Sequence, residues 1–227
     1  MSKIYNVLIV DDHPIIADAY KSAFEFISAE NKEIEFNISI VTNCDDAIEN
    51  ITAASKSNGV GIDIIFLDIS LPPSTDGKYL SGEDLGIKIK EVLPKCKIIV
   101  ATTFNDNYRI QVILRNVNPD GFLIKNDINK DELVSSIKTI MDNSPYYSKS
   151  VLELFRKQSS IDYQLDKIDR QLLYEMSIGT KMKDLPKIIP MSMPGLEKRK
   201  KQLKELFKVK DNDDRELILK AKEKGFI

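Results

Sequence analysis

Acidic side chains stand directly after two short apolar runs of this chain. Tyr5 to Val10 is followed by Asp11 and Asp12, and residues 62–67 are followed by Asp68. Short runs of β-branched and other apolar residues are typical of strands that are buried on both faces. Because ligands of open parallel sheets bind beyond the carboxyl ends of the strands, we expect the three carboxylates to meet there.

Two further polar side chains follow the next candidate strands. Thr102 comes after the run 97–101, and Lys125 comes after the run 121–124. Loop carboxylates are preferred ligands of Mg²⁺, and three crowded acids need a divalent cation to offset their repulsion. A hydroxyl and an ammonium group add the positioning and charge neutralisation that phosphoryl transfer requires. Each residue alone also fits a turn, a helix cap or a solvated position, so the prediction depends on the whole set in this order.

The elements that must position this set can be read from the periodicity. A fifth run, Ile34 to Val41, alternates like an edge strand. Stretches with apolar residues at helical spacing separate the runs, at 15–27, 47–51, 85–92, 110–114 and 133–140. Alternating strands and helices predict an α/β fold with a doubly wound, five-stranded parallel sheet over residues 1–142.

The last third of the chain has a different character. Residues 143–163 mix Ser, Pro, Tyr and charged residues and are predicted as a linker, and residues 164–227 as a small all-α domain. Helices are expected at 165–176, 192–209 and 213–224, with a weaker one at 181–189 because Pro186 lies inside it. Residues 162–227 carry a net charge of +4, and residues 1–161 carry a net charge of −6. This contrast is expected of an acidic regulatory domain that is followed by a cationic output domain.

Three motifs of the first part resemble the receiver domain of two-component response regulators. They are VDDHP (10–14), LDISLP (67–72) and GFLIKN (121–126), and the resemblance extends over Tyr5 to Asp142. It implies a flavodoxin-like fold, and it implies that a sensor histidine kinase phosphorylates Asp68. By the same resemblance, Asp12, Asp68 and the backbone carbonyl of Ser70 bind Mg²⁺ directly, and Asp11 acts mainly through water.

The resemblance also assigns roles to the other residues of the set. Lys125 pairs with the phosphoryl oxygens, Thr102 hydrogen-bonds to the phosphoryl group, and Phe122 is the aromatic residue whose rotamer reports the switch. His13 is read as a first-turn helix residue without a catalytic role, since Pro14 suits the first helical position.

One segment departs from the family pattern. Residues 73–81 are longer than the usual tight turn after the phosphoacceptor segment. We expect this insertion, with Lys78 and Tyr79, to overhang the site and to alter partner choice or the lifetime of the phosphoryl group.

The helical tail resembles the LuxR-type helix-turn-helix output domain over residues 164–227, although the start of its third helix diverges from the family. The resemblance implies DNA binding with the third helix in the major groove and regulation of transcription by a dimer that forms on phosphorylation. Five cations lie between residues 198 and 204, and Lys198, Arg199 and Lys201 are predicted to contact DNA.

Two alternatives remain open. The tail could bind a protein partner instead of DNA. The chain could also be a phosphatase with an aspartyl nucleophile, but such enzymes usually carry a second acid where Ser70 stands, so we expect no enzyme beyond autodephosphorylation. The sequence has no long apolar run and no signal-like start, which predicts a cytoplasmic protein without membrane contact.

Overall fold

The computed structural model describes residues 2–56, 61–104, 106–156, 165–210 and 212–227. Its contacts divide the chain into two compact units. Unit 1 contains residues 1–105 and 113–158, and unit 2 contains residues 106–112 and 159–227.

Unit 1 is built on a parallel sheet with the strand order β2-β1-β3-β4-β5-β6. The strands are β1 (Lys3–Val10), β2 (Ile34–Val41), β3 (Ile64–Asp68), β4 (Lys97–Thr102), β5 (Gly121–Ile124) and β6 (Tyr146–Tyr147). The doubly wound α/β fold is confirmed, with one strand more than predicted. The strand order reverses between β1 and β3, so the carboxyl ends of these two strands border the crevice where such folds bind ligands.

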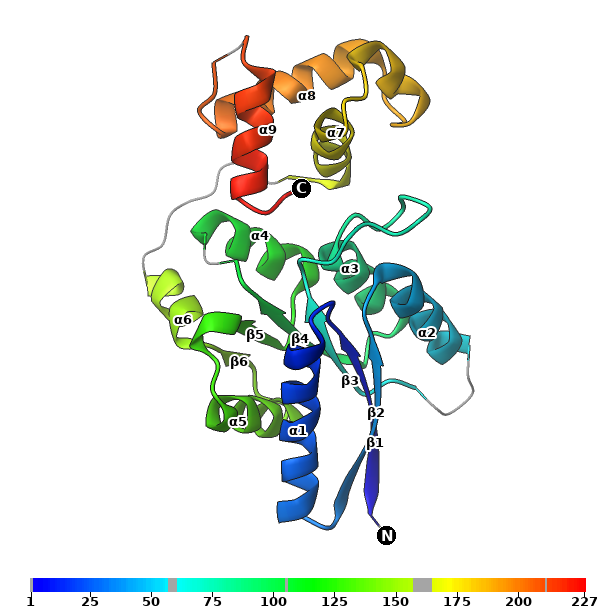
Figure 1. Ribbon diagram of the computed structural model, residues 1–227, viewed down its shortest axis with the longest axis vertical. Coiled ribbons are helices and arrows are strands. Elements are labelled where there is room, and N and C mark those ends of the chain that lie inside the picture. The colour runs from blue at the N-terminus through cyan, green and yellow to red at the C-terminus, as the bar shows by residue number, and fades with distance from the viewer. Residues whose placement is uncertain (1, 57–60, 105, 157–164, 211) are drawn as a thin grey trace. The chain divides into compact units, whose positions relative to one another are not determined.

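Helices pack on both faces of this sheet. They are α1 (Pro14–Glu30), α2 (Cys44–Lys56), α3 (Gly82–Val92), α4 (Asn107–Val117), α5 (Lys130–Met141) and α6 (Lys149–Arg156), with a 3₁₀ turn η1 (Lys125–Asp127) after β5. Only residues 113–117 of α4 belong to unit 1. α1 and α5 lie on one face of the sheet, and α2 and α3 lie on the other (Figure 1). Under α1, Phe66 stacks on Tyr20 with ring centroids 4.6 Å apart and meets Phe24 edge to face.

The segment 143–163, predicted as a linker, is folded as far as the structure describes it. Tyr146 and Tyr147 pair with the first two residues of β5, and α6 follows directly. The sequence did not indicate these two elements, because a two-residue strand and an eight-residue helix are too short to produce a clear periodicity. Residues 157–163 lie outside the described residues, so a domain boundary there stays a prediction.

Unit 2 contains α7 (Lys167–Ser177), a 3₁₀ helix η2 (Met182–Lys187), α8 (Met193–Leu206) and α9 (Asp214–Glu223). These elements share a buried core of leucines, which includes Leu172, Leu185, Leu196, Leu203 and Leu217. Pro186 lies inside η2, consistent with a short 3₁₀ segment there instead of an α-helix. The all-α prediction is confirmed. None of the described helices is both long and apolar enough to cross a membrane.

Candidate functional site

Acidic side chains converge at the carboxyl ends of β1 and β3. Asp11 and Asp12 follow β1, and Asp68 is the last residue of β3. Possible ligand atoms of these three residues and of His13 all lie within 4.8 Å of one another. Asp11 and Asp68 are 0% and 2% exposed, whereas the side chain of Asp12 is 31% exposed. The structure therefore brings together the three carboxylates that the strand ends predicted.

Lys125 lies between two of these acids. Its Nζ is 2.7 Å from Oδ2 of Asp11 and 2.7 Å from Oδ2 of Asp68. The backbone N–H of Ser70 donates to Oδ1 of Asp68 at 2.9 Å, so both oxygens of this carboxylate have a partner. Burial raises the pKa of Asp68, and the hydrogen bonds from Lys125 and Ser70 offset part of that rise.

The donor set fits a divalent cation. Three carboxylates face one ammonium group, which leaves an excess of negative charge in a largely buried site when all are ionised. Hard carboxylate and carbonyl oxygens are the ligands that Mg²⁺ prefers. Asp12, Asp68 and the backbone at Ser70 could hold such an ion.

His13 contributes a contact that the sequence did not predict. It is the N-cap residue of α1 rather than a first-turn residue, and Pro14 occupies the first helical turn. The Nδ1 of His13 lies 2.5 Å from Oδ1 of Asp12, and its backbone N–H donates to Oδ1 of Asp11 at 3.0 Å. In the sequence, the only indication of this contact was the position of His13 directly after Asp11 and Asp12.

Thr102 and Phe122 lie on neighbouring central strands and are both 0% exposed. Thr102 ends β4, and its Oγ1 accepts the backbone N–H of Phe104 at 3.2 Å. Within the described residues, no hydrogen bond joins Thr102 to Asp68. Phe122 pairs with Val100 in the sheet. The structure thus places both residues in the predicted strands without joining either to the acidic cluster.

Gly82 lies close to Asp68, the candidate phosphoacceptor. The sequence did not predict this contact. Gly82 begins α3, and its N–H donates to the carbonyl of Ile69 at 3.2 Å. A Cβ atom at this position would lie 1.8 Å from the backbone oxygen of Asp68. Only glycine can therefore bring the start of α3 this close to the end of β3.

The insertion 73–81 is fixed to neighbouring helices. The hydroxyl of Thr75 donates to Asp45 at the start of α2 at 2.8 Å, and the N–H of Leu80 donates to Asp84 of α3 at 2.8 Å. Lys78 forms an ion pair with Asp76 inside the insertion. Among the described residues, no recorded contact joins the insertion to the acidic cluster, so an effect on phosphoryl lifetime stays a prediction.

In unit 2, Arg199 of α8 is held by the start of α7. Its Nη1 lies 2.6 Å from Asp166 and 2.9 Å from Asp169, the two residues of the α7 capping box. Asp169 is 1% exposed, so Arg199 neutralises a buried carboxylate. Arg199 is one of the three residues predicted to contact DNA, and it is paired here with acids of its own domain.

The other cations of α8 fall into two groups. Lys200 and Lys204 both form ion pairs with Asp214 of α9. Lys198 and Lys201 are exposed, and within the described part of the chain they have no ion pair. The structure therefore leaves these two lysines accessible to a polyanion.

The acidic cluster and the sheet are those of a receiver domain. A family model described as the response regulator receiver domain matches residues 7–138, more than half of the chain, so the chain belongs to this family. In this chain the receiver domain is followed by the small all-α unit 2.

Curated relatives agree with this assignment. The oxygen regulatory protein NreC of Staphylococcus carnosus is 24% identical over 140 residues, which cover 62% of this chain and 56% of that protein. A nitrate/nitrite response regulator protein homologue of Haemophilus influenzae is 28% identical over 178 residues, which cover 77% of this chain and 75% of that protein. The match thus spans little more than half the length of the first relative.

Solved structures match almost the whole chain. RcsB from Salmonella enterica serovar Typhimurium, bound to a promoter in the presence of the phosphomimetic BeF₃⁻, is 22% identical with a TM-score of 0.67. The match covers 97% of this chain and 99% of that one. A second RcsB structure, also bound to a promoter, has a TM-score of 0.59 and covers 96% and 97% of the two chains. At this identity the likeness concerns the fold.

Proposed function

We propose that a sensor histidine kinase phosphorylates this chain on Asp68 and that unit 2 then regulates transcription by binding DNA. The observation that carries the first part is the buried Asp68 carboxylate, which is held by Lys125 and Ser70 beside two further acids. Phosphoryl transfer needs a positioned oxygen nucleophile and neutralised charge, and this site can supply both.

The chemistry follows from the positions of these side chains. Asp12, Asp68 and the Ser70 carbonyl would hold Mg²⁺, with Asp11 acting through water, and the ion would neutralise charge on the transferred group. An oxygen of Asp68 attacks phosphorus, the P–N bond of a phosphohistidine breaks, and the released imidazole nitrogen takes up a proton. Water can later hydrolyse the acyl phosphate, which is the autodephosphorylation that we expect of this site.

Phosphorylation would act as a population shift. Lys125 moves from the free carboxylate to the phosphoryl oxygens, and the Thr102 hydroxyl turns from Phe104 to the same group. Phe122 then changes rotamer in the adjacent strand. The added charge thereby biases the receiver towards a second state, which we propose forms a homodimer in the cytoplasm.

DNA binding is supported by the relatives and by the charge on α8. Structures of RcsB have been solved with promoter DNA bound. NreC and the Haemophilus influenzae relative are named as a regulatory protein and a response regulator. Lys198 and Lys201 are the exposed cations that we propose contact DNA phosphates. Arg199, which the sequence also suggested as a contact, is a weaker candidate because it is paired with Asp166 and Asp169.

The phosphorylation arm is tested with the full-length chain, Mg²⁺ and acetyl phosphate. Intact-mass spectrometry should show one added phosphoryl group on the wild type and none on Asp68→Asn. Omitting Mg²⁺ should abolish the reaction. Phosphorylation of Asp68→Asn to the wild-type level would reject Asp68 as the acceptor.

The DNA arm is tested by fluorescence anisotropy with promoter fragments across a salt series, with and without BeF₃⁻ and Mg²⁺. Binding that weakens steeply with salt and strengthens with the phosphomimetic supports a DNA-binding regulator. A second candidate, an output domain that binds a protein, is favoured by the pairing of three of the five α8 cations with acids. Binding without a salt slope would support that candidate.

A further inference from the structure

Asp127 joins the turn after Lys125 to the start of α6. It is the last residue of η1, the 3₁₀ turn that Lys125 begins. Its Oδ2 accepts the hydroxyl of Ser148 at 2.8 Å and the backbone N–H of Ser150 at 3.0 Å, and its Oδ1 accepts the hydroxyl of Ser150 at 2.8 Å. One carboxylate thus binds three donors around the first turn of α6.

The same contacts reach back into the sheet. The hydroxyl of Ser148 also accepts the backbone N–H of Ile124, the residue directly before Lys125, at 3.1 Å. Ser148 is 0% exposed, so a partner lost there cannot be replaced readily by water. Burial raises the pKa of Asp127, but the hydrogen bonds from Ser150 and Ser148 lower it more, so the carboxylate is held in its charged form.

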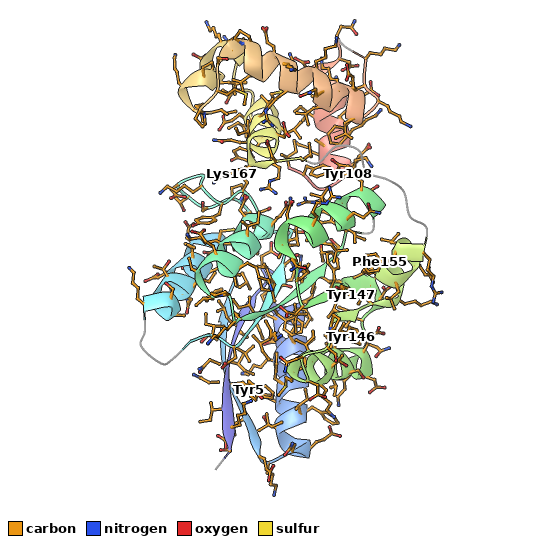
Figure 2. All side chains as sticks on the ribbon, turned by 180° about the vertical axis from the view of Figure 1, so that it is seen from behind. Tyr5, Tyr108, Tyr146, Tyr147, Phe155 and Lys167 are labelled. Atoms are coloured by element: carbon orange, nitrogen blue, oxygen red, sulfur yellow. The ribbon has the colours of Figure 1, made fainter. Side chains whose placement is uncertain are left out.

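α6 is itself attached to the sheet beside these contacts. The rings of Tyr147 in β6 and Phe155 in α6 meet edge to face, with centroids 5.4 Å apart (Figure 2). Val151 of α6 is 0% exposed. α6 is the last described helix of unit 1, and unit 2 follows it in the chain.

We propose that Asp127 is a positioning residue that couples Lys125 to α6. When Lys125 leaves Asp68 for a phosphoryl group, the turn that it begins shifts, and the hydrogen bonds of Asp127 to Ser148 and Ser150 weaken. The first turn of α6 then loosens. This inference rests on the proposed phosphorylation of Asp68 and adds a route by which the phosphorylated site acts on the end of the receiver.

The coupling must be reciprocal. If the phosphorylated state weakens the Asp127 contacts, then removal of these contacts must favour that state by the same factor. Asp127→Ala is therefore expected to bind BeF₃⁻ about tenfold more tightly than the wild type, a factor typical of coupling between sites. A residue that served only the stability of α6 would leave this affinity unchanged.

The test uses the full-length chain with Mg²⁺ and BeF₃⁻. ¹⁹F NMR titration gives the affinity for the phosphomimetic, and hydrogen exchange of residues 149–156 reports α6. In the wild type, BeF₃⁻ should speed this exchange by about tenfold. In Asp127→Ala the exchange should be fast in both states. Asp127→Asn keeps an acceptor oxygen for Ser150. It should shift the BeF₃⁻ affinity and the α6 exchange rate in the same direction as Asp127→Ala, but less. This variant provides the test if the alanine variant does not fold.

Asn129→Ala is the matched control. Asn129 caps α5 just after the same turn by accepting the N–H of Glu132 at 2.9 Å, and it makes no recorded contact with α6 among the described residues. This variant should keep the affinity and the α6 response of the wild type, although loss of a cap costs about 1 kcal/mol. If it matches Asp127→Ala, the effect is general loosening and the coupling is rejected.

The remaining outcomes separate this inference from the proposed function. If the wild type binds BeF₃⁻ and Asp68→Asn does not, but α6 does not respond or Asp127→Ala behaves as the wild type, the coupling alone fails. If the wild type itself does not bind BeF₃⁻, phosphorylation of Asp68 fails and the coupling falls with it.

Discussion

The ammonium nitrogen of Lys125 lies 2.7 Å from Oδ2 of Asp68 and is shared with Asp11. One cation with a 7% exposed side chain is therefore shared by two buried carboxylates and offsets only part of their charge. In the unphosphorylated chain Lys125 pairs with both acids, and in the phosphorylated chain we propose that it binds the phosphoryl group. The two tasks compete for the same nitrogen atom.

Lys125→Ala should destabilise unit 1 in the absence of Mg²⁺. Removing one partner of a buried ion pair costs roughly 3 to 5 kcal/mol, because the acids keep their charge without compensation. Mg²⁺ should restore part of this loss, since the acidic cluster then binds a divalent cation more tightly. Urea unfolding with and without Mg²⁺ measures both effects. Lys138→Ala removes an exposed pair with Glu30, so it should cost about 1 kcal/mol or less and show no such Mg²⁺ dependence.

Gly82→Ala should disrupt the approach of α3 to the phosphoacceptor. The new methyl group would overlap the Asp68 carbonyl oxygen, so the backbone must move, at a cost of about 3 kcal/mol or more. The midpoint temperature of thermal unfolding and the rate of phosphorylation by acetyl phosphate should both fall. Gly61→Ala is the control, because no described atom other than those of its chain neighbours lies within 4 Å of a Cβ atom there. Equal stability of the two variants would contradict the prediction.

Arg199→Ala should act on stability more than on the salt dependence of DNA binding. It leaves buried Asp169 without its guanidinium partner, which should lower the free energy of unfolding by about 1 to 3 kcal/mol. Lys201→Ala should change stability by no more than about 0.5 kcal/mol and reduce the salt slope of binding by about 1. Chemical denaturation and anisotropy across a salt series distinguish them. A large loss of salt slope in Arg199→Ala would show that Arg199 does contact DNA.

Asp120→Asn should reduce stability in a pH-dependent way. Burial raises the pKa of Asp120, but the N–H of Ile98 and the ammonium groups of Lys90 and Lys97 lower it more, so it lies below its ordinary value in the folded state. A lowered folded pKa adds stability above the unfolded pKa of about 4 and loses it as the pH falls through the folded pKa.

We therefore expect the difference in unfolding free energy between the wild type and Asp120→Asn to be about 1 to 2 kcal/mol at neutral pH. It should shrink below about pH 4. Urea unfolding from pH 7 to pH 3 measures this difference. A difference that stays constant over the range would show that the charge of Asp120 does not carry the effect.

Much of unit 1 could be predicted because its central strands are buried on both faces. That burial requires apolar runs such as 64–67, and the rule for open parallel sheets then places Asp11, Asp68 and Lys125 at one end. β6 was missed because Tyr146 and Tyr147 carry no pattern of their own and are defined by pairing with β5.

Contacts between residues far apart in sequence could not be predicted from local patterns. In the sequence Arg199 is one of five neighbouring cations. Only the packing of α8 against α7 pairs it with Asp166 and Asp169, some thirty residues earlier. The contact of His13 with Asp12 depends on the N-cap geometry of α1. In both cases the residue type was visible in the sequence but its partner was not.

The short strand β6 covers the open edge of β5. Gly121 and Phe122 of β5 pair with β6, and all four residues of β5 are buried. A fragment cut at residue 142 would lack β6 and expose this apolar strand as an unpaired edge, which is a template for aggregation. An isolated receiver that keeps this edge covered therefore has to extend at least through Tyr147.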